Sequence, residues 1–371
     1  MASSVKSTRN MGLDILRALA MFFVICQHFL GQGELVSHAV GSGKFWFLNF
    51  LQILVYCSVN IYGITTGYLL CEKAFRLSRL TKLWLTTVFW SVVVSCCFFL
   101  FMPESRSFSE AVSMFLPILR GRYWFFTAYF VVMLVSPVLN LLIRSLSRRQ
   151  FHLLFAALFL IFGVVPVASL GNDVLRISSG HHFSWMIVLY LIGGYLRKYA
   201  HCLSAPNMRS PYRWLLLYFL LALIHLAYQV FVSVIGLPSF AALLLTYPSP
   251  FILGEAVCLF LFCKDAFRNI SADGFIGKLI RFISPGVYSV YIIHVHPLVF
   301  WNEGIIGLFR SWDHLGIGAV FGALILTSAA VFAVCILLDF LRQHLFRAIG
   351  INRIAEHWSD KLETLVRTYI R

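Results

Sequence analysis

Charged side chains are scarce in this chain of 371 residues. Only 12% of the residues are Asp, Glu, Lys or Arg, whereas about a quarter are charged in an average soluble domain. Hydrophobic residues make up 60% of the sequence, and the mean hydropathy is +0.83. So apolar a chain cannot cover a water-facing surface with polar side chains. The composition therefore excludes an ordinary soluble domain and favours a membrane protein.

Acidic residues are the scarcer charge, with 15 Asp and Glu against 30 Lys and Arg and a net charge of +15. A basic surplus can indicate nucleic-acid binding. Here the basic residues occur in short runs between apolar stretches, so membrane topology explains them better. We expect no nucleic-acid partner.

Metal-binding and disulfide patterns are also missing. The nine cysteines form no CxxC pair and show no other ligand spacing, and most lie inside apolar stretches. They are interpreted as small buried hydrophobic residues, and no metal is expected. The sequence also lacks internal repeats and low-complexity tracts.

Ten apolar stretches are long enough, or nearly long enough, to cross the roughly 30 Å hydrocarbon core of a bilayer. Continuous apolar runs favour helices over the alternating strands of a barrel. The predicted fold is thus all-α, a polytopic membrane protein of about ten transmembrane helices. The predicted spans are residues 11–30, 45–70, 83–102, 123–143, 151–170, 184–199, 214–235, 240–263, 284–301 and 316–339.

The loop charges predict the orientation. Twenty-three basic residues fall in the two tails and in alternate loops, whereas six fall in the opposite loops. Basic loops stay in the cytoplasm, so both termini are predicted to be cytoplasmic and the chain to lie in the cytoplasmic (inner) membrane. The first span is no cleavable signal, because it contains Asp14 and Arg17 and lacks a small-residue cleavage site.

Two regions are predicted: a transmembrane domain at residues 1–341 and a basic tail at residues 342–371. The tail alternates apolar and basic residues. This pattern is typical of an amphipathic helix on the lipids of the inner leaflet. We expect no catalytic role for it.

Ionisable residues inside membrane spans are costly and often functional. The first span holds three: Asp14 and Arg17, one turn apart, and His28, eleven residues after Arg17. Eleven residues are about three helical turns, so Arg17 and His28 share a face roughly 16 Å apart. The alternative is an ion pair that anchors the helix and a hydrogen-bonded core histidine, but the alignment of all three favours a functional role.

Several motifs resemble the membrane acyltransferase-3 family, whose members O-acylate extracytoplasmic glycans and related acceptors. The most specific is an Arg, ten residues and a His in the first helix, matched by Arg17 and His28 with Asp14 upstream. In the motif around Gly67, the family usually has Ser before the Gly, whereas this chain has Thr66. The other motifs are Thr65-Thr66-Gly67-Tyr68-Leu69, Arg76-x-x-Arg79, Tyr123-Trp124-Phe125-Phe126-Thr127-Ala128-Tyr129 and the string from Val287 to Pro297.

The resemblance implies acetyl-CoA as donor and a glycan or lipid-linked sugar as acceptor. Acetyl-CoA is cytoplasmic and the acceptor faces outward, so the acyl group must cross the bilayer within the protein. The resemblance points to Arg76 and Arg79 as contacts for the CoA phosphates, for which the arginine fork is well suited. They could equally be ordinary topology signals.

An acceptor hydroxyl is a poor nucleophile and needs a base. We expect His28 to be that base, with Arg17 and Asp14 positioning the donor or holding the helix. A covalent acyl intermediate stays open.

Weaker candidates for substrate binding are His294 and Tyr291, one turn apart in the ninth span, and Glu255 in the eighth. Trp124 and Tyr129 are candidates for stacking on a sugar. The alternative for the candidates in the eighth and ninth spans is a structural role in the core. For Trp124 and Tyr129 the alternative is the ordinary enrichment of aromatic residues at the membrane interface.

A secondary transporter or glycan flippase would share the helix count and the buried charges. Such proteins more often show matched broken helices in two half-chains, and no such pairing is found. Neither the acceptor, nor the choice between acetyl and a longer acyl group, follows from the sequence.

Overall fold

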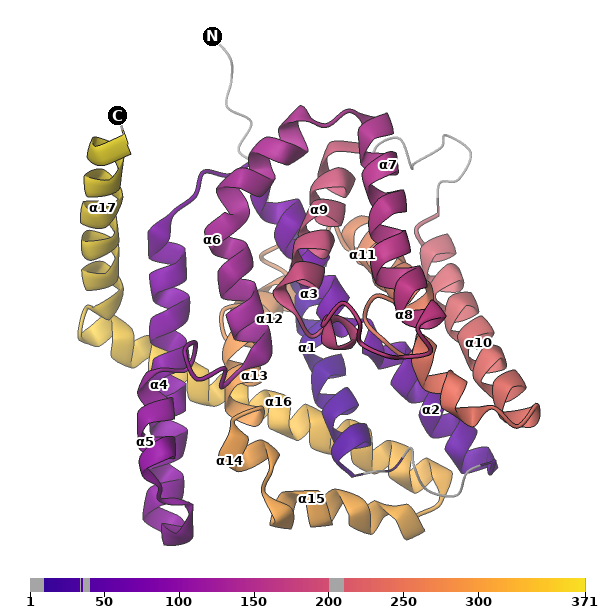
Figure 1. Cartoon of the computed structure of the whole chain (residues 1–371). Helices are drawn as coiled ribbons and strands as arrows, with labels where there is room; N and C mark the ends of the chain where they lie inside the picture. Colours follow the sequence, from indigo (N-terminus) through magenta and orange to yellow (C-terminus); the bar gives the residue numbers. More distant parts are fainter. Residues whose placement is uncertain (1–9, 34, 36–40, 200–209, 371) are drawn as a thin grey trace.

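The computed structural model describes residues 10–33, 35, 41–199 and 210–370. Over these residues the chain is helical and contains no strand. Figure 1 shows a bundle in which α1 (Met11–Gln32) is central. This helix packs against α2 (Gly43–Tyr56), α3 (Ser58–Leu70), α11 (Pro250–Ala266), α13 (Val287–His294) and α16 (Ile317–Ala348).

Seven segments among the described residues are long and apolar enough to cross a membrane. Two of them are interrupted: α2 and α3 meet at Cys57, and α7 (Arg148–Phe159) is joined to α8 (Val165–Ala168) by a π-helical turn, Leu160–Val164. The other five are α1, α4 (Leu77–Phe101), α6 (Trp124–Ser145), α10 (Tyr212–Val234) and α16. The predicted all-α, multi-pass membrane fold is confirmed.

The remaining three predicted spans are shorter or broken. Helix α9 (Phe183–Tyr199) and α11 have 17 residues each. Helices α12 (Phe275–Ile283) and α13 form a pair bent by 45°, which would bring the candidate spans to eight. The total of ten therefore stays a prediction.

Two predicted boundaries were wrong, and proline explains both. The span predicted from residue 240 opens as a 3-10 helix, Pro238–Leu244, and α11 begins only at Pro250. The span predicted at 284–301 ends its helix at His294, and α14 (Pro297–Phe300) follows. Proline is well placed at the start of a helix and drives the preceding residue into an extended conformation; His296 has φ −55° and ψ 130°.

Glycines allow α3 and α9 to approach closely. A Cβ on Gly67 would lie 2.0 Å from the carbonyl oxygen of Tyr190, and one on Gly193 would lie 2.1 Å from that of Ile64. Small residues at such crossings are common in membrane bundles, where packing holds helices together. The contact fixes α3, which carries part of the candidate site.

The predicted division at residue 341 falls inside a helix and stays a prediction. Helix α16 continues without a break to Ala348, and α17 (Ile351–Ile370) begins after the turn at Gly350. Helix α17 lies antiparallel to α4 (Figure 1). The Thr81 and Ser359 hydroxyls are 2.9 Å apart, and Lys82 pairs with Glu356. The amphipathic helix predicted here thus packs against protein through part of its surface.

Candidate active site

Two histidines from distant parts of the chain meet beside α1. Nδ1 of His28 lies 3.1 Å from Nε2 of His294 on α13. The edge of the His28 ring packs against Phe300 of α14. Helices α13 and α14 are separated by a short break after His294, and one residue of each contacts His28.

The hydrogen bonds of this pair fix the position of each proton. Nδ1 of His294 contacts the carbonyl oxygen of Val290, which can only accept, so Nδ1 donates. Nε2 of a neutral His294 is then an acceptor, and the proton between the rings belongs to Nδ1 of His28. This arrangement leaves the lone pair on Nε2 of His28, the atom that a general base needs.

A cavity of 220 Å³ lies on the same side of α1. Arg17, Thr65, Tyr129 and Tyr291 are among the residues that line it. The hydroxyls of Thr65 and Tyr291 are buried, and neither donates to an acceptor among the described residues; that of Tyr291 faces the backbone N–H groups of Phe125 and Phe126. Unsatisfied buried hydroxyls at a cavity wall are suited to a polar ligand.

A smaller cavity of 20 Å³ contains His28, Gln27 and Trp124 in its lining. Its volume has room for little more than one water-sized group. Met21, Tyr62, Phe125 and Tyr291 line both cavities. The two cavities therefore adjoin. This pair, with Arg17 at one end and the narrower, His28-lined cavity at the other, is called the path below.

Arg17 and Asp14 differ in their position relative to the two cavities. Arg17 lines the larger cavity, and its Nη1 lies 3.8 Å from Oδ1 of Asp14. Asp14 is buried and is absent from the lining of both cavities. The carbonyl oxygen of Arg17 accepts a hydrogen bond of 2.7 Å from Tyr62. Tyr62 thus ties α3 to α1 where the cavity passes between them.

The aromatic candidates lie at opposite ends of the path. Tyr129 lines the Arg17 cavity, whereas Trp124 lines the His28 cavity. Trp124 stacks on Tyr247 at a centroid distance of 6.0 Å, and His181 lies 4.7 Å from each of these rings. Tyr247 and His181 could not be predicted as site residues, because both lie in irregular segments whose position depends on the fold.

Arg76 and Arg79 do not line the cavity. Arg76 precedes α4, and Arg79 donates to the carbonyl oxygen of Ala74 in the same connection. The connection lies near the Arg17 end, because Leu70 before it and Leu83 after it both line the cavity.

Glu255 is fully buried in α11, and both carboxyl oxygens lack a hydrogen-bond partner among the described residues. It lines neither cavity of the path. The structure therefore brings together His28, His294, Tyr291, Arg17, Tyr129 and Trp124, and leaves Glu255, Arg76 and Arg79 outside.

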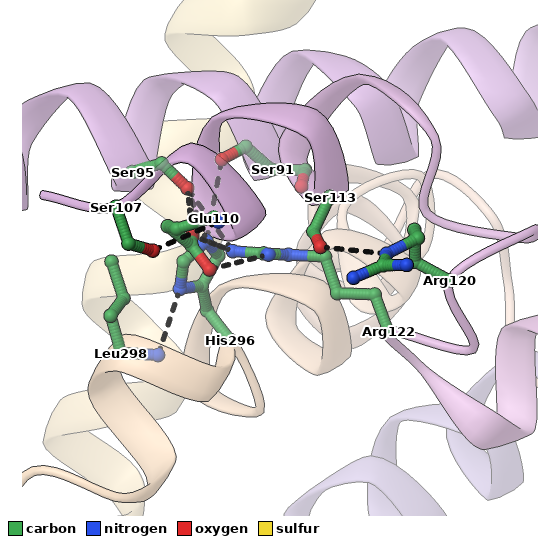
Figure 2. A network of polar contacts seen from close by, with 9 residues as sticks. All are labelled: Ser91, Ser95, Ser107, Glu110, Ser113, Arg120, Arg122, His296 and Leu298. Atoms are coloured by element: carbon green, nitrogen blue, oxygen red, sulfur yellow. Dashed lines mark hydrogen bonds and ion pairs between the residues drawn. The ribbon is translucent and has the colours of Figure 1, made fainter.

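A half-buried ionic network includes His296, two residues after His294 (Figure 2). The guanidinium of Arg122 pairs with the carboxylate of Glu110 on α5 (Phe108–Phe115) and contacts Nε2 of His296 at 2.7 Å. Ser95 of α4 donates to Glu110 at 2.7 Å. The network connects α4, α5, the turn before α6 and the α13–α14 break, and so holds the segment that follows His294.

The ion pair sets the charge of Glu110. Burial raises the pKa of this carboxyl, but hydrogen bonds from Arg122 and Ser95 and the charge of Arg122 outweigh burial and leave the pKa below its ordinary value. In the sequence, Arg122 is one of the six basic residues that fall in the loops opposite the basic-rich side. Neither the partner at residue 110 nor the burial of the pair could be inferred before α5 was placed.

Comparison with known proteins identifies the family of the chain. No group of three or more His, Cys, Asp or Glu side chains that could hold a metal occurs among the described residues. No curated protein and no solved structure matches the chain. The family model of an acyltransferase domain matches residues 10–339, which include both histidines, the cavity and the ionic network. The chain belongs to the acyltransferase-3 family.

Proposed function

We propose that the protein transfers an acetyl group from cytoplasmic acetyl-CoA to a hydroxyl of an extracytoplasmic or lipid-linked glycan, in the cytoplasmic membrane of a bacterium. The observation that carries the proposal is the path from Arg17 to His28, which ends at a histidine with a free Nε2 lone pair. Membership of an acyltransferase family supplies the class of reaction.

The donor would enter at the Arg17 end. Arg76 and Arg79 precede and begin α4 near that end, where their guanidinium groups can contact the CoA phosphates. The pantetheine arm would extend through the 220 Å³ cavity toward the histidines. The separation of Arg17 and His28, roughly 16 Å along a helix, is the distance that this arm must cover.

The acceptor hydroxyl would approach Nε2 of His28 from the opposite end. Nε2 takes the hydroxyl proton as the oxygen attacks the thioester carbonyl, and the tetrahedral intermediate forms. When the carbon–sulfur bond breaks, His28 returns the proton to the leaving CoA thiolate. His294 holds the His28 ring in the required tautomer throughout.

The oxyanion needs a hydrogen-bond donor. Tyr291 fits this role because its O–H proton has no acceptor among the described residues and the side chain lines both cavities. A donor without a competing partner can be directed at charge that develops during the reaction.

The test uses the purified protein in detergent. Acetyl-CoA should raise its melting temperature, and label from [14C]acetyl-CoA should appear as an ester on a cell-envelope glycan fraction. Mass and NMR spectra of glycans with and without the gene would then identify acceptor and acyl group. Stabilisation by a glycan alone, with no effect of acetyl-CoA, would favour a transporter and contradict the proposal.

A further inference from the structure

A second pair of adjoining cavities lies outside the path between Arg17 and His28. The first, of 400 Å³, is apolar and lies between α7, α9 and α11, with Leu158 and Trp185 in its wall. The second, of 330 Å³, lies between residues 166–179 and 239–248. Phe162 and Pro248 line both. Together they form one site with an apolar and a polar chamber.

The apolar chamber is placed for a hydrocarbon chain. Its outer wall is α7 with the π-helical turn that follows, and both carry apolar residues that are largely exposed, such as Leu153 and Leu160. In a membrane such residues face lipid. Pi-helical turns are frequent at functional sites, and Phe162 within this turn lines the chamber.

The polar chamber has the chemistry of a site for hydroxyl groups. Asn172, Asp173, Ser179 and Thr246 are among the described residues that line it, and neither Lys nor Arg is among them. Amide, carboxylate and hydroxyl groups bind sugar hydroxyls through hydrogen bonds, whereas a phosphate would call for a cation.

The segment that forms this chamber is strained. Leu170, Arg176, Ser178 and Ser179 have positive φ angles between 46° and 54°. Asp173 accepts hydrogen bonds from the backbone N–H groups of Ile177 and Ser178 at 2.7 and 2.8 Å, which hold the loop in place. Backbone strain of this kind clusters at ligand sites.

Only a thin wall separates these chambers from His28. Tyr247 lines the His28 cavity, and the next residue, Pro248, lines both chambers. Gly180 packs on this wall, because a Cβ there would lie 2.8 Å from atoms of both Tyr247 and Pro248. Asn60 fixes the wall: it donates to the carbonyl oxygen of Tyr247 and accepts from Trp185 of the apolar chamber.

We propose that the two chambers bind the acceptor as a glycolipid, with its alkyl or isoprenoid chain between α7, α9 and α11 and its neutral sugar in the polar chamber. This inference rests on the proposed acyl transfer only in calling the bound glycolipid the acceptor. The site itself rests on the adjoining chambers, the absence of a cation among the described lining residues and the thin wall to His28.

Binding is tested without catalysis. The full chain in phosphatidylcholine nanodiscs is titrated with dodecyl β-maltoside brominated on its chain, which quenches nearby tryptophan. The difference between wild type and Trp185→Phe isolates the signal of Trp185. Quenching should saturate and be reversed by unbrominated dodecyl β-maltoside, but not by dodecylphosphocholine. If dodecyl β-maltoside and dodecylphosphocholine reversed the quenching equally, or if Trp185 were not quenched, the brominated compound would be bound only as annular lipid. Either result would overturn the proposal.

The second part of the experiment measures acetyl transfer to dodecyl β-maltoside. Leu158→Trp, which fills the apolar chamber, should raise the KM for dodecyl β-maltoside roughly tenfold or more, as loss of contact for two or more CH2 groups requires. The KM for acetyl-CoA should not change. Leu153→Trp is the matched control, because this leucine is on the same helix and faces outward.

The two arms separate the hypotheses. Quenching of Trp185 without transfer to any maltoside would contradict the acyl-transfer reaction for this acceptor and leave the glycolipid site standing. Transfer with the same KM in Leu158→Trp and wild type would overturn the glycolipid site and leave the reaction standing. Melting curves of both tryptophan variants show that they are folded.

Discussion

Nδ1 of His28 on α1 lies 3.1 Å from Nε2 of His294 on α13, although 266 positions separate them in the sequence. The Val290 carbonyl oxygen fixes the proton on the far nitrogen of His294. The chain of hydrogen bonds therefore determines which nitrogen of His28 is free. His294 acts in this account as a positioning residue, since it orients the base and does not itself touch the acceptor.

Substitution of His294 should reveal this role through a graded loss. His294→Gln offers an amide oxygen to Nδ1 of His28 and should keep more activity than His294→Leu, which offers no acceptor. We expect His294→Leu to lower kcat about 100-fold, because misorientation of a reacting group costs on that scale. The KM for acetyl-CoA should stay constant. Equal kcat in the two variants would contradict the orienting role.

The constriction beside His28 predicts acyl selectivity. Met21 lines both cavities of the path, so Met21→Ala should widen it and raise the use of butyryl-CoA relative to acetyl-CoA. Leu30→Ala on the same helix removes a fully buried side chain outside the path. Each substitution costs about 2–5 kcal/mol of stability. If both shifted the selectivity alike, general loosening and not the constriction would explain it.

Removal of Arg76 and Arg79 tests the donor end. The double variant Arg76→Ala, Arg79→Ala should show a higher KM for acetyl-CoA, and the difference from wild type should shrink at high salt, since screening weakens phosphate contacts. Arg148→Ala with Arg149→Ala removes the same charge from two exposed positions on α7 and is the matched control. The same KM in both double variants would make Arg76 and Arg79 topology signals only.

The Arg122–Glu110 pair predicts a pH effect on stability. The pKa of Glu110 lies below its ordinary value, so the stability from ionised Glu110 is present above the ordinary glutamate pKa. It is lost as the pH falls through the depressed pKa. Glu110→Gln should therefore lower the melting temperature at neutral pH and differ less from wild type in acid. A difference that does not change with pH would contradict this.

Arg122→Met leaves the half-buried Glu110 carboxylate without its cation and should cost about 1–3 kcal/mol. Because the network also holds the α13–α14 break, kcat should fall in the same variant. The exposed pair of Arg281 and Asp273 is the control: its loss should cost roughly 0–1 kcal/mol.

The sequence predicted the helical membrane fold and the candidate histidines because hydropathy and buried charge are local signals. It could not predict that His28 and His294 would touch, since that contact depends on the packing of α13 against α1, two helices far apart in the sequence. The break at Cys57 has no proline or glycine to signal it. The ion pair of Glu110 and the docking of α17 on α4 are long-range contacts between segments that look like ordinary loop and tail.

The measurement that tests the central claim most directly is acetyl transfer by His28→Gln. The amide can still donate to Nε2 of His294 but has no nitrogen that can take a proton. Turnover should fall by at least about 10²–10⁴, the contribution of a general base, while acetyl-CoA still stabilises the protein. His225→Gln replaces a buried histidine that lines neither cavity of the path and should keep its turnover. Near-normal transfer by His28→Gln would contradict the assignment of His28 as the base.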